Sequence, residues 1–211
     1  MNLTLGTLAE LKAHLLNASL VSATDYDDAI AALGLGVAAL FEQTCHRKFA
    51  RAEDGTHEDR ADRRTLILPC YPLEEITTIE LRDTMAGGWV DQGAPDELLL
   101  NRDDAAGLLD FGVTFGAEGS RLRVTYTGGF WFLGLDELLT IPAGATARPD
   151  DLFLAWLLQC EAVWKVRDKL GLNIGGSGGD STQLLGLSLA GAEIIPVAQR
   201  ILRGYTRRVI L

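Results

Sequence analysis

One short segment limits the folds open to this 211-residue chain more than any other. Residues 152–158 read LFLAWLL, and they lie in a helix that is predicted to begin at Pro149 and to end near Leu170. This segment is apolar on every side of the helix, and a helix of that kind is buried on every side. We therefore expect the chain's own body to cover one face, and either the same chain or a neighbouring subunit to cover the other.

Two other helices are predicted before this one. Thr7 and Glu10 have the spacing of a capping box, so a short helix is expected from Thr7 to Leu16. A longer helix should begin near Thr24, where three aspartates suit its positive end, and should end near His46. Both helices carry an apolar stripe of the kind that packs on a core.

The residues between the second and third helices have the pattern of β-strands. The clearest strand runs from Arg121 to Thr127, where polar and apolar side chains alternate before Gly128. Gly87 and Gly88 suit a hairpin turn. Shorter strands are predicted at 66–68, around Ile79 and Leu81, at 98–100 and at 108–113.

These elements predict an α+β protein: a small bundle of three main helices and a short C-terminal helix, with an antiparallel β insertion between helices two and three. We expect a single domain over 1–211, with the β-rich insertion at 50–147. Residues 171–196 are rich in glycine and serine, which is typical of a mobile loop. Pro196 then begins the last helix, within a basic C-terminal segment at 197–211.

The charge of the chain argues against one large class of function. There are 29 acidic and 19 basic residues, a net charge of −10, whereas gripping nucleic acid requires clustered lysine and arginine. Specific nucleic-acid binding is therefore not expected. The charge is uneven, because residues 197–211 hold four arginines and no acid. That segment is a candidate for docking on an acidic partner, the alternative being a solvated terminus.

Cysteine usage and hydropathy indicate the compartment. Cys45, Cys70 and Cys160 are scattered and form no CxxC pair, so reduced thiols in a reducing compartment are expected. The first residues lack the pattern of a signal peptide, and no uninterrupted apolar run approaches the roughly 20 residues that cross a bilayer. We therefore expect a cytosolic protein that does not bind membranes.

One motif resembles a catalytic motif. Residues 175–179 match G-x-S-x-G, the turn that presents a nucleophilic serine in many hydrolases, which would make Ser177 the nucleophile. That turn needs a strand before it, a helix after it and a histidine later in the chain. A predicted helix precedes it instead, and the histidines all lie upstream, at His14, His46 and His57. A small serine hydrolase is thus a disfavoured alternative, and no catalytic residue is predicted.

No metal or cofactor site is predicted. Cys45 and His46 stand without the second ligand pair that a zinc site requires. The acidic residues between 53 and 62 are interrupted by arginines and lack the alternation of a calcium loop, so a solvated loop or hairpin tip is expected there. The glycine-rich 175–179 is not followed by the Gly-Lys-Ser/Thr of a phosphate-binding loop.

The order of several short motifs resembles the head–tail connector, or neck adaptor, family of tailed bacteriophages. The motifs are LAELK at 8–12, EQTCHRKF at 42–49, LILPCYPLEEI at 66–76, VTYTGGF at 124–130, RPDDL at 148–152 and LRGYTRR at 202–208. Together they span nearly the whole chain. The segment from 82 to 119 is longer than in minimal members, and Gly204-Tyr205-Thr206 stands where the family often has Pro-Tyr-Arg.

This resemblance implies a structural protein and not an enzyme. Members form a ring, expected here at about twelve copies, that joins the portal to the stopper or tail after genome packaging. DNA passes through the lumen of such a ring, and an acidic wall would repel its phosphates. The protein is then expected in the neck of the virion, and in the host cytoplasm during assembly.

Two binding surfaces follow from this interpretation. The subunit interface is assigned to the apolar helix, at Phe153, Trp156 and Leu157. Portal docking is assigned to the C-terminal segment, at Arg200, Ile201, Arg203, Tyr205, Arg207, Arg208 and Leu211. No cofactor is expected.

Two alternatives stay open. A tail-completion or tail-terminator protein also forms rings, but usually has a larger sheet and only one main helix. A carbohydrate- or peptide-binding module could be built on the β insertion, with Trp89 or Trp131 as a stacking platform, although such tryptophans are more often core residues.

Overall fold

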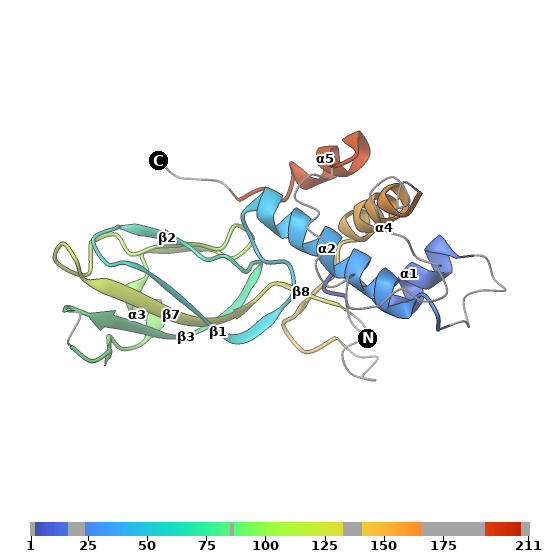
Figure 1. The fold of residues 1–211 in the computed structure, drawn as a ribbon. Coiled ribbons are helices and arrows are strands. Elements are labelled where there is room, and N and C mark those ends of the chain that lie inside the picture. The colour runs from blue at the N-terminus through green and yellow to red at the C-terminus, as the bar shows by residue number, and fades with distance from the viewer. Residues whose placement is uncertain (1–2, 17–23, 85–86, 133–140, 166–192, 208–211) are drawn as a thin grey trace. The chain divides into compact units, whose positions relative to one another are not determined.

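The computed structural model describes residues 3–16, 24–84, 87–132, 141–165 and 193–207. The chain divides into two compact units (Figure 1). The described residues of the helical unit fall within 1–46, at 132 and within 148–207, and those of the β unit within Arg47–Trp131 and Ile141–Ala147. The α+β class that the sequence predicted is confirmed.

The described part of the helical unit contains α1 (Leu8–Leu15), α2 (Asp27–Cys45), α4 (Asp150–Lys165) and α5 (Pro196–Leu202). Helix α2 contacts α1, α4 and α5, and α4 also contacts α1 and α5. The three long elements fall where the sequence predicted them. The residues that follow Lys165, where α4 was expected to continue, lie outside the described residues, as does most of 171–196.

Local chemistry sets the ends of the first two helices. The predicted capping box is present: the Glu10 backbone N–H donates to Thr7 Oγ1 at 3.2 Å, and the Thr7 N–H donates to Glu10 Oε2 at 2.7 Å. Helix α2 ends at Cys45 and is capped by His46, whose φ of 53° is left-handed and whose N–H bonds back to the last turn. Both boundaries therefore follow from a few residues that are adjacent in the sequence.

The core of the helical unit surrounds Trp156. Its side chain is fully buried, and its indole N–H donates to the Gly34 carbonyl at 3.0 Å. A Cβ at Gly34 would lie 3.0 Å from the Trp156 ring and 2.8 Å from Leu3, and one at Gly6 would lie 2.6 Å from the ring. The two glycines therefore leave the space that the indole fills. Other fully buried side chains are Leu5, Leu11, Ile30, Val37, Phe41, Leu152 and Cys160.

The β unit contains two antiparallel sheets, a parallel pair of short strands and one short helix (Figure 1). The four-stranded sheet has the order β1 (Ala52–Arg60), β7 (Arg121–Gly128), β3 (Leu73–Arg82) and β4 (Val90–Asp91). The three-stranded sheet has the order β2 (Thr65–Ile67), β6 (Leu108–Asp110) and β5 (Asn101–Asp103). The remaining elements are α3 (Pro95–Leu98) and the pair β8 (Phe130–Trp131) and β9 (Thr146–Ala147).

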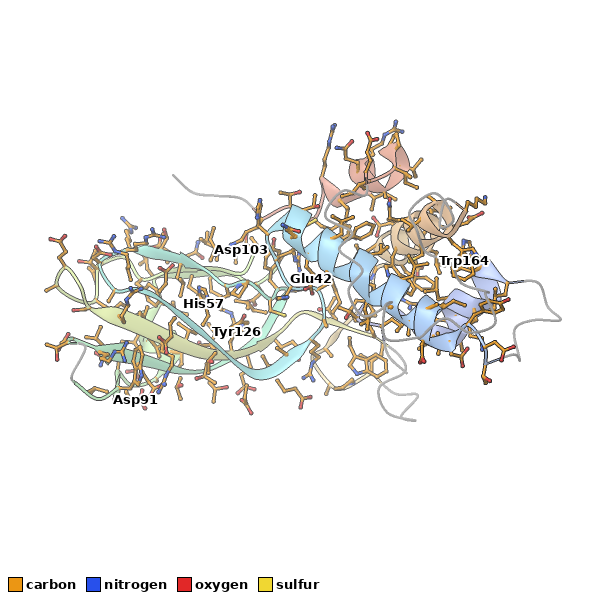
Figure 2. The ribbon with its side chains drawn as sticks, in the orientation of Figure 1. Glu42, His57, Asp91, Asp103, Tyr126 and Trp164 are labelled. Carbon is orange, nitrogen blue, oxygen red and sulfur yellow. The ribbon has the colours of Figure 1, made fainter. Side chains whose placement is uncertain are left out.

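Strand β7 is central and alternates as predicted. Leu122, Val124 and Tyr126 are buried in a core shared with β2, β3 and β6, while the residues between them face the other side. The hydroxyl of Tyr126, labelled in Figure 2, accepts a hydrogen bond from the Cys70 N–H at 3.2 Å. This bond joins β7 to the segment that follows β2.

The start of the β unit is held by a buried arginine. Arg47 is 5% exposed, and its guanidinium carbon lies 3.4 Å from the centre of the Tyr71 ring. It also lies 5.1 Å from the ring of Phe49 and 5.3 Å from that of Phe130. A buried guanidinium is stabilised by aromatic faces because their quadrupole is negative.

Two predictions for the β unit were wrong. Most of the acidic segment between 53 and 62, expected to be a solvated loop or hairpin tip, lies in β1, whose one partner among the described strands is β7. An edge strand can have charged side chains on both faces. Its sequence then lacks the alternation of polar and apolar residues by which other strands are predicted. Leu98, predicted to begin a strand, ends helix α3, because Pro95 begins a helical turn there, and β5 begins only at Asn101.

Helix α2 is long and apolar enough to cross a membrane by length and composition alone. Half of that stretch is buried inside the unit. The core helix of a soluble protein can be equally long and apolar, so it meets the same criterion. The finding therefore gives little reason to place α2 in a membrane.

Candidate partner-binding surfaces

The structure separates the three residues that were assigned to a subunit interface on α4. Trp156 belongs to the chain's own core, because it is fully buried and bonded to Gly34. Its assignment to an intersubunit contact is therefore wrong for the side chain. Phe153 and Leu157 are half-buried, and between them in sequence Leu154 is 49% exposed. The covered and open sides of α4 could not be told apart from a run that is apolar all round.

The open side of α4 is partly shielded by the chain itself. The Arg148 guanidinium carbon lies 3.5 Å from the centre of the Phe153 ring, and the same side chain donates to Glu10 at 3.2 Å. Phe153 also stacks on Trp156, with ring centres 5.9 Å apart. Phe153 is therefore held in place from two sides, while Leu154 projects into solvent.

The C-terminal segment packs on the helical unit. Ala198 and Leu202 are buried, with exposed fractions of 0% and 1%. The buried Gln159 of α4 bonds to the backbone just before α5: its Nε2 donates to the Glu193 carbonyl at 3.2 Å, and its Oε1 accepts from the Ile195 N–H at 2.9 Å. The buried side chains and the backbone of this segment therefore have partners within the helical unit, so its described residues are not a terminus surrounded by solvent.

The residues assigned to portal docking are therefore in different environments. Tyr205 donates its hydroxyl to Asp151 at 2.6 Å, and the Arg207 N–H donates to the Cys45 carbonyl at 2.8 Å. Ile201 is half-buried, whereas the side chains of Arg200 and Arg203 are exposed. Arg208 and Leu211 lie outside the described residues.

Paired charges cover much of the β unit. Arg51 forms a two-pronged ion pair with Glu74, with nitrogen–oxygen distances of 2.8 Å, and Arg123 pairs in the same way with Glu80 at 2.7 and 2.9 Å. Hydrogen bonding to Glu74 raises the pKa of Arg51, although burial opposes this. Hydrogen bonding to Glu80 likewise raises the pKa of Arg123. These arginines stay charged and fix the carboxylates opposite them.

One candidate stacking platform is already occupied. The ring of Trp89 has the guanidinium carbon of Arg82 at 4.6 Å and that of Arg123 at 4.4 Å from its centre. A sugar ring that stacked on the same face of the indole as either guanidinium would have to displace that cation. Sequence reasoning named the tryptophan but missed its arginines, which come from two different strands, β3 and β7.

The described residues offer little for chemistry. All three cysteines are free and buried, and burial raises the pKa of Cys160, which keeps its thiol protonated and unreactive. Within the described ranges, no group of three or more His, Cys, Asp and Glu side chains could hold a metal ion. His14 lies 3.2 Å from Glu161, in a partly exposed pair on the surface of the helical unit. Ser177 lies outside the described residues.

The chain shares its fold with proteins of phage-like particles. One solved structure with this fold is a chain in the neck of an empty gene transfer agent particle, computed with C6 symmetry. The likeness has a TM-score of 0.60 at 18% identity and covers 100% of this chain and 95% of that one. A chain from the virion of the native gene transfer agent particle matches with a TM-score of 0.55, also at 18% identity, over 99% of this chain and 92% of that one.

These structures confirm, at the level of the fold, the resemblance to neck proteins that the sequence motifs indicated. Comparison with protein families and with curated proteins gives no match.

Proposed function

We propose that this protein is a non-enzymatic structural subunit of the neck of a tailed, phage-type particle, where its copies form a ring that joins the portal to the stopper or tail. The observation that carries the proposal is the shared fold with a neck chain over essentially the full length of both proteins. The six-fold symmetry of that neck is compatible with a ring of six or twelve copies, and we propose about twelve for this chain.

The contacts of the ring are proposed on α4. Ring contacts are heterologous, so one face of a subunit meets a different face of the next. Leu154, with the half-buried Phe153 and Leu157 beside it, offers an apolar patch that the described residues leave open, and a neighbouring subunit is the proposed cover. Because Leu154 is already exposed, a charge there should leave the subunit folded and weaken the ring.

Portal docking is proposed on the outer face of the C-terminal segment. Arg200 and Arg203 present exposed guanidinium groups there, and Ile201 adds apolar surface. Arg208 and Leu211 stay part of the proposed docking segment. Exposed arginines contribute little affinity each but direct encounter with an acidic partner, so the apolar residues should account for most of the binding.

Two experiments test this function. Removing the gene from the producing genome should give filled heads that fail to join tails, with rescue by the wild-type chain. Native mass spectrometry of portal rings mixed with the full chain should then show a closed set of about twelve added copies. Normal tailed particles without the gene, or a single copy on each portal ring, would refute the proposal.

The docking residues have a separate test. The double variant Arg200→Glu/Arg203→Glu should unfold at the same denaturant concentration as wild type but fail to co-sediment with portal rings. Arg63→Glu, an exposed arginine of the β unit with 61% of its side chain accessible, is the matched control and should still co-sediment. Co-sedimentation of the double variant at wild-type level would place portal docking elsewhere.

A further inference from the structure

The outer face of the four-stranded sheet carries three arginines in one row. Strand register places Arg60 of β1 opposite Arg121 of β7, and Arg121 opposite Arg82 of β3. Residues paired across strands point to the same side, so the three side chains lie on one face at the strand spacing of about 4.8 Å. We call Arg60, Arg121 and Arg82 the arginine row.

In the next row along the same face, carboxylates outnumber the single arginine. Glu58 of β1 and Glu80 of β3 both lie opposite Arg123, and Arg123 forms its two-pronged pair with Glu80. Asp91, labelled in Figure 2, follows on β4 opposite Glu80. Beyond this row come three threonines, Thr56, Thr125 and Thr78. The unbalanced positive charge on this face is therefore confined to the arginine row.

The arginine row has few carboxylates of its own. Arg121 is exposed and forms no ion pair with any residue that the structure describes. Arg60 forms a two-pronged pair with Asp62 at 3.1 and 2.5 Å, but 50% of the Arg60 side chain is accessible, so solvent screens this pair and leaves the guanidinium open to a further anion. Arg82 rests on Trp89, and its buried Nε has no hydrogen-bond partner among the described residues. Like charges placed directly opposite one another repel, so the row is better satisfied with an anion bound.

We propose that the arginine row binds an acidic helical segment of a partner protein. Carboxylates at positions i and i+4 of a helix are about 5–6 Å apart, close to the strand spacing of the row. Alternate residues of an extended strand are about 6.6 Å apart and match less well. Each guanidinium can take a carboxylate through two parallel hydrogen bonds. Trp89 lies beside the row, with the Arg82 guanidinium over its ring, and this contact favours one position of the Arg82 side chain.

A polyanion such as DNA fits this surface less well. The row is only three cations wide, the neighbouring row contains Glu58 and Glu80, and the whole chain carries a net charge of −10. A long phosphate backbone would have to cross these carboxylates, whereas a short acidic helix needs to cover only the row. The partner is therefore a protein segment with a few carboxylates on one helical face.

The test uses the full chain and a fluorescein-labelled alanine-based peptide with glutamate at every fourth position. Fluorescence anisotropy at low salt should show binding that weakens about tenfold in Arg121→Gln and that is lost for the same peptide with glutamine in place of glutamate. Arg64→Gln removes an exposed arginine that pairs with Asp110 outside the row, so it is the matched control and should bind within about twofold of wild type.

Three outcomes overturn the proposal. If Arg121→Gln and Arg64→Gln weakened peptide binding equally, the peptide would be attracted to positive charge in general and not to the arginine row. Equal binding of the glutamate and glutamine peptides would remove any role for carboxylates, and tighter binding of a short duplex DNA than of the peptide would make the ligand a nucleic acid. Circular dichroism of each variant confirms folding before binding is compared. The peptide assay needs neither portal nor particles, so its failure leaves the proposed neck function untouched.

Discussion

The helical unit and the β unit are stabilised by different kinds of contact. The helical unit depends on close packing: Trp156 fills a space that Gly6 and Gly34 leave open, and the buried side chains around it are mainly apolar. The β unit also has an apolar core, but its arginines contribute to a greater extent, with Arg47 buried among aromatic rings and Arg51 paired with a nearly buried glutamate.

This difference predicts which changes each unit tolerates. A close-packed apolar core responds to lost volume, because the cavity that is left does not collapse fully. A buried ion pair responds to the loss of one partner, because the other charge stays desolvated without compensation. The helical unit should therefore be sensitive to truncation at Trp156, and the β unit to neutral substitution at Glu74.

The largest effect is expected from Trp156→Ala. Losing a fully buried indole and its hydrogen bond to Gly34 should lower the free energy of unfolding by about 4 kcal/mol. Urea denaturation followed by circular dichroism measures it. Leu154→Ala on the same helix is the control and should change the free energy of unfolding by about 0.5 kcal/mol or less, since Leu154 is 49% exposed. If the two variants lost equal free energy of unfolding, Trp156 would not be the central residue of this core.

The second effect belongs to the β unit. Glu74 and Arg51 have side chains that are 8% and 14% exposed, and in Glu74→Gln the Arg51 guanidinium would keep only its ion pair with the exposed Glu53 among the described residues. The loss of the less exposed partner should cost about 2 kcal/mol. Hydrogen exchange should place the loss in the β unit, with α2 and α4 still protected. Asp110→Asn breaks the exposed pair with Arg64 and should have a much smaller effect. If the backbone amides of both units lost protection from hydrogen exchange equally, the two units would not be stabilised independently of each other.

The third effect depends on pH and concerns the helical unit. Burial acts to raise the pKa of Glu10, but hydrogen bonds from Arg148 and Thr7 outweigh it and lower the pKa below its ordinary value. A carboxyl whose pKa is lower in the folded state stabilises the fold above its unfolded pKa, and this stabilisation is lost as the pH falls through the folded pKa. Stability of the wild type should therefore drop between about pH 5 and pH 3 by more than that of Glu10→Gln. Parallel pH profiles for the two proteins would show that Glu10 contributes nothing.

The smallest effect is expected from Tyr205→Phe in the C-terminal segment, with Leu202→Ala as the comparison. Tyr205→Phe removes the exposed hydrogen bond to Asp151 and should lower the free energy of unfolding by about 0.5 kcal/mol. Leu202→Ala truncates a side chain that is 1% exposed and should lower it by about 3 kcal/mol. Chemical denaturation of the two variants gives both values. If Leu202→Ala were as mild as Tyr205→Phe, the segment would not depend on packing within the helical unit.

Elements that short-range chemistry determines were predictable from the sequence. The capping box at Thr7 needs only Glu10, and the alternation of β7 needs only its own eight residues. Strand β1 was missed because an edge strand with charges on both faces has no apolar period. Nothing within its residues shows that β7 will pair with it.

The candidate surfaces were harder to predict, because they depend on residues far apart in the chain. Trp156 faces inward because Gly34, more than a hundred residues earlier, leaves room for it, and no pattern within LFLAWLL reveals that. The C-terminal segment resembled a free basic tail, yet Gln159 and the buried Leu202 fix it to α4 and its neighbours. The arginine row depends on strand register, which the hydrophobic pattern alone did not supply.

Strand β1 has one further consequence. Among the residues that the structure describes, no strand pairs with its outer edge, and a bare edge is a template on which a second polypeptide can add by backbone hydrogen bonding. Its exposed side chains include Glu53, Asp54, Glu58 and Arg60, and the bulge between Ala52 and Gly55 interrupts its regular pairing. Such an edge resists the uncontrolled growth of fibres when many identical molecules are crowded at high local concentration, and so leaves association to surfaces that limit the number of copies.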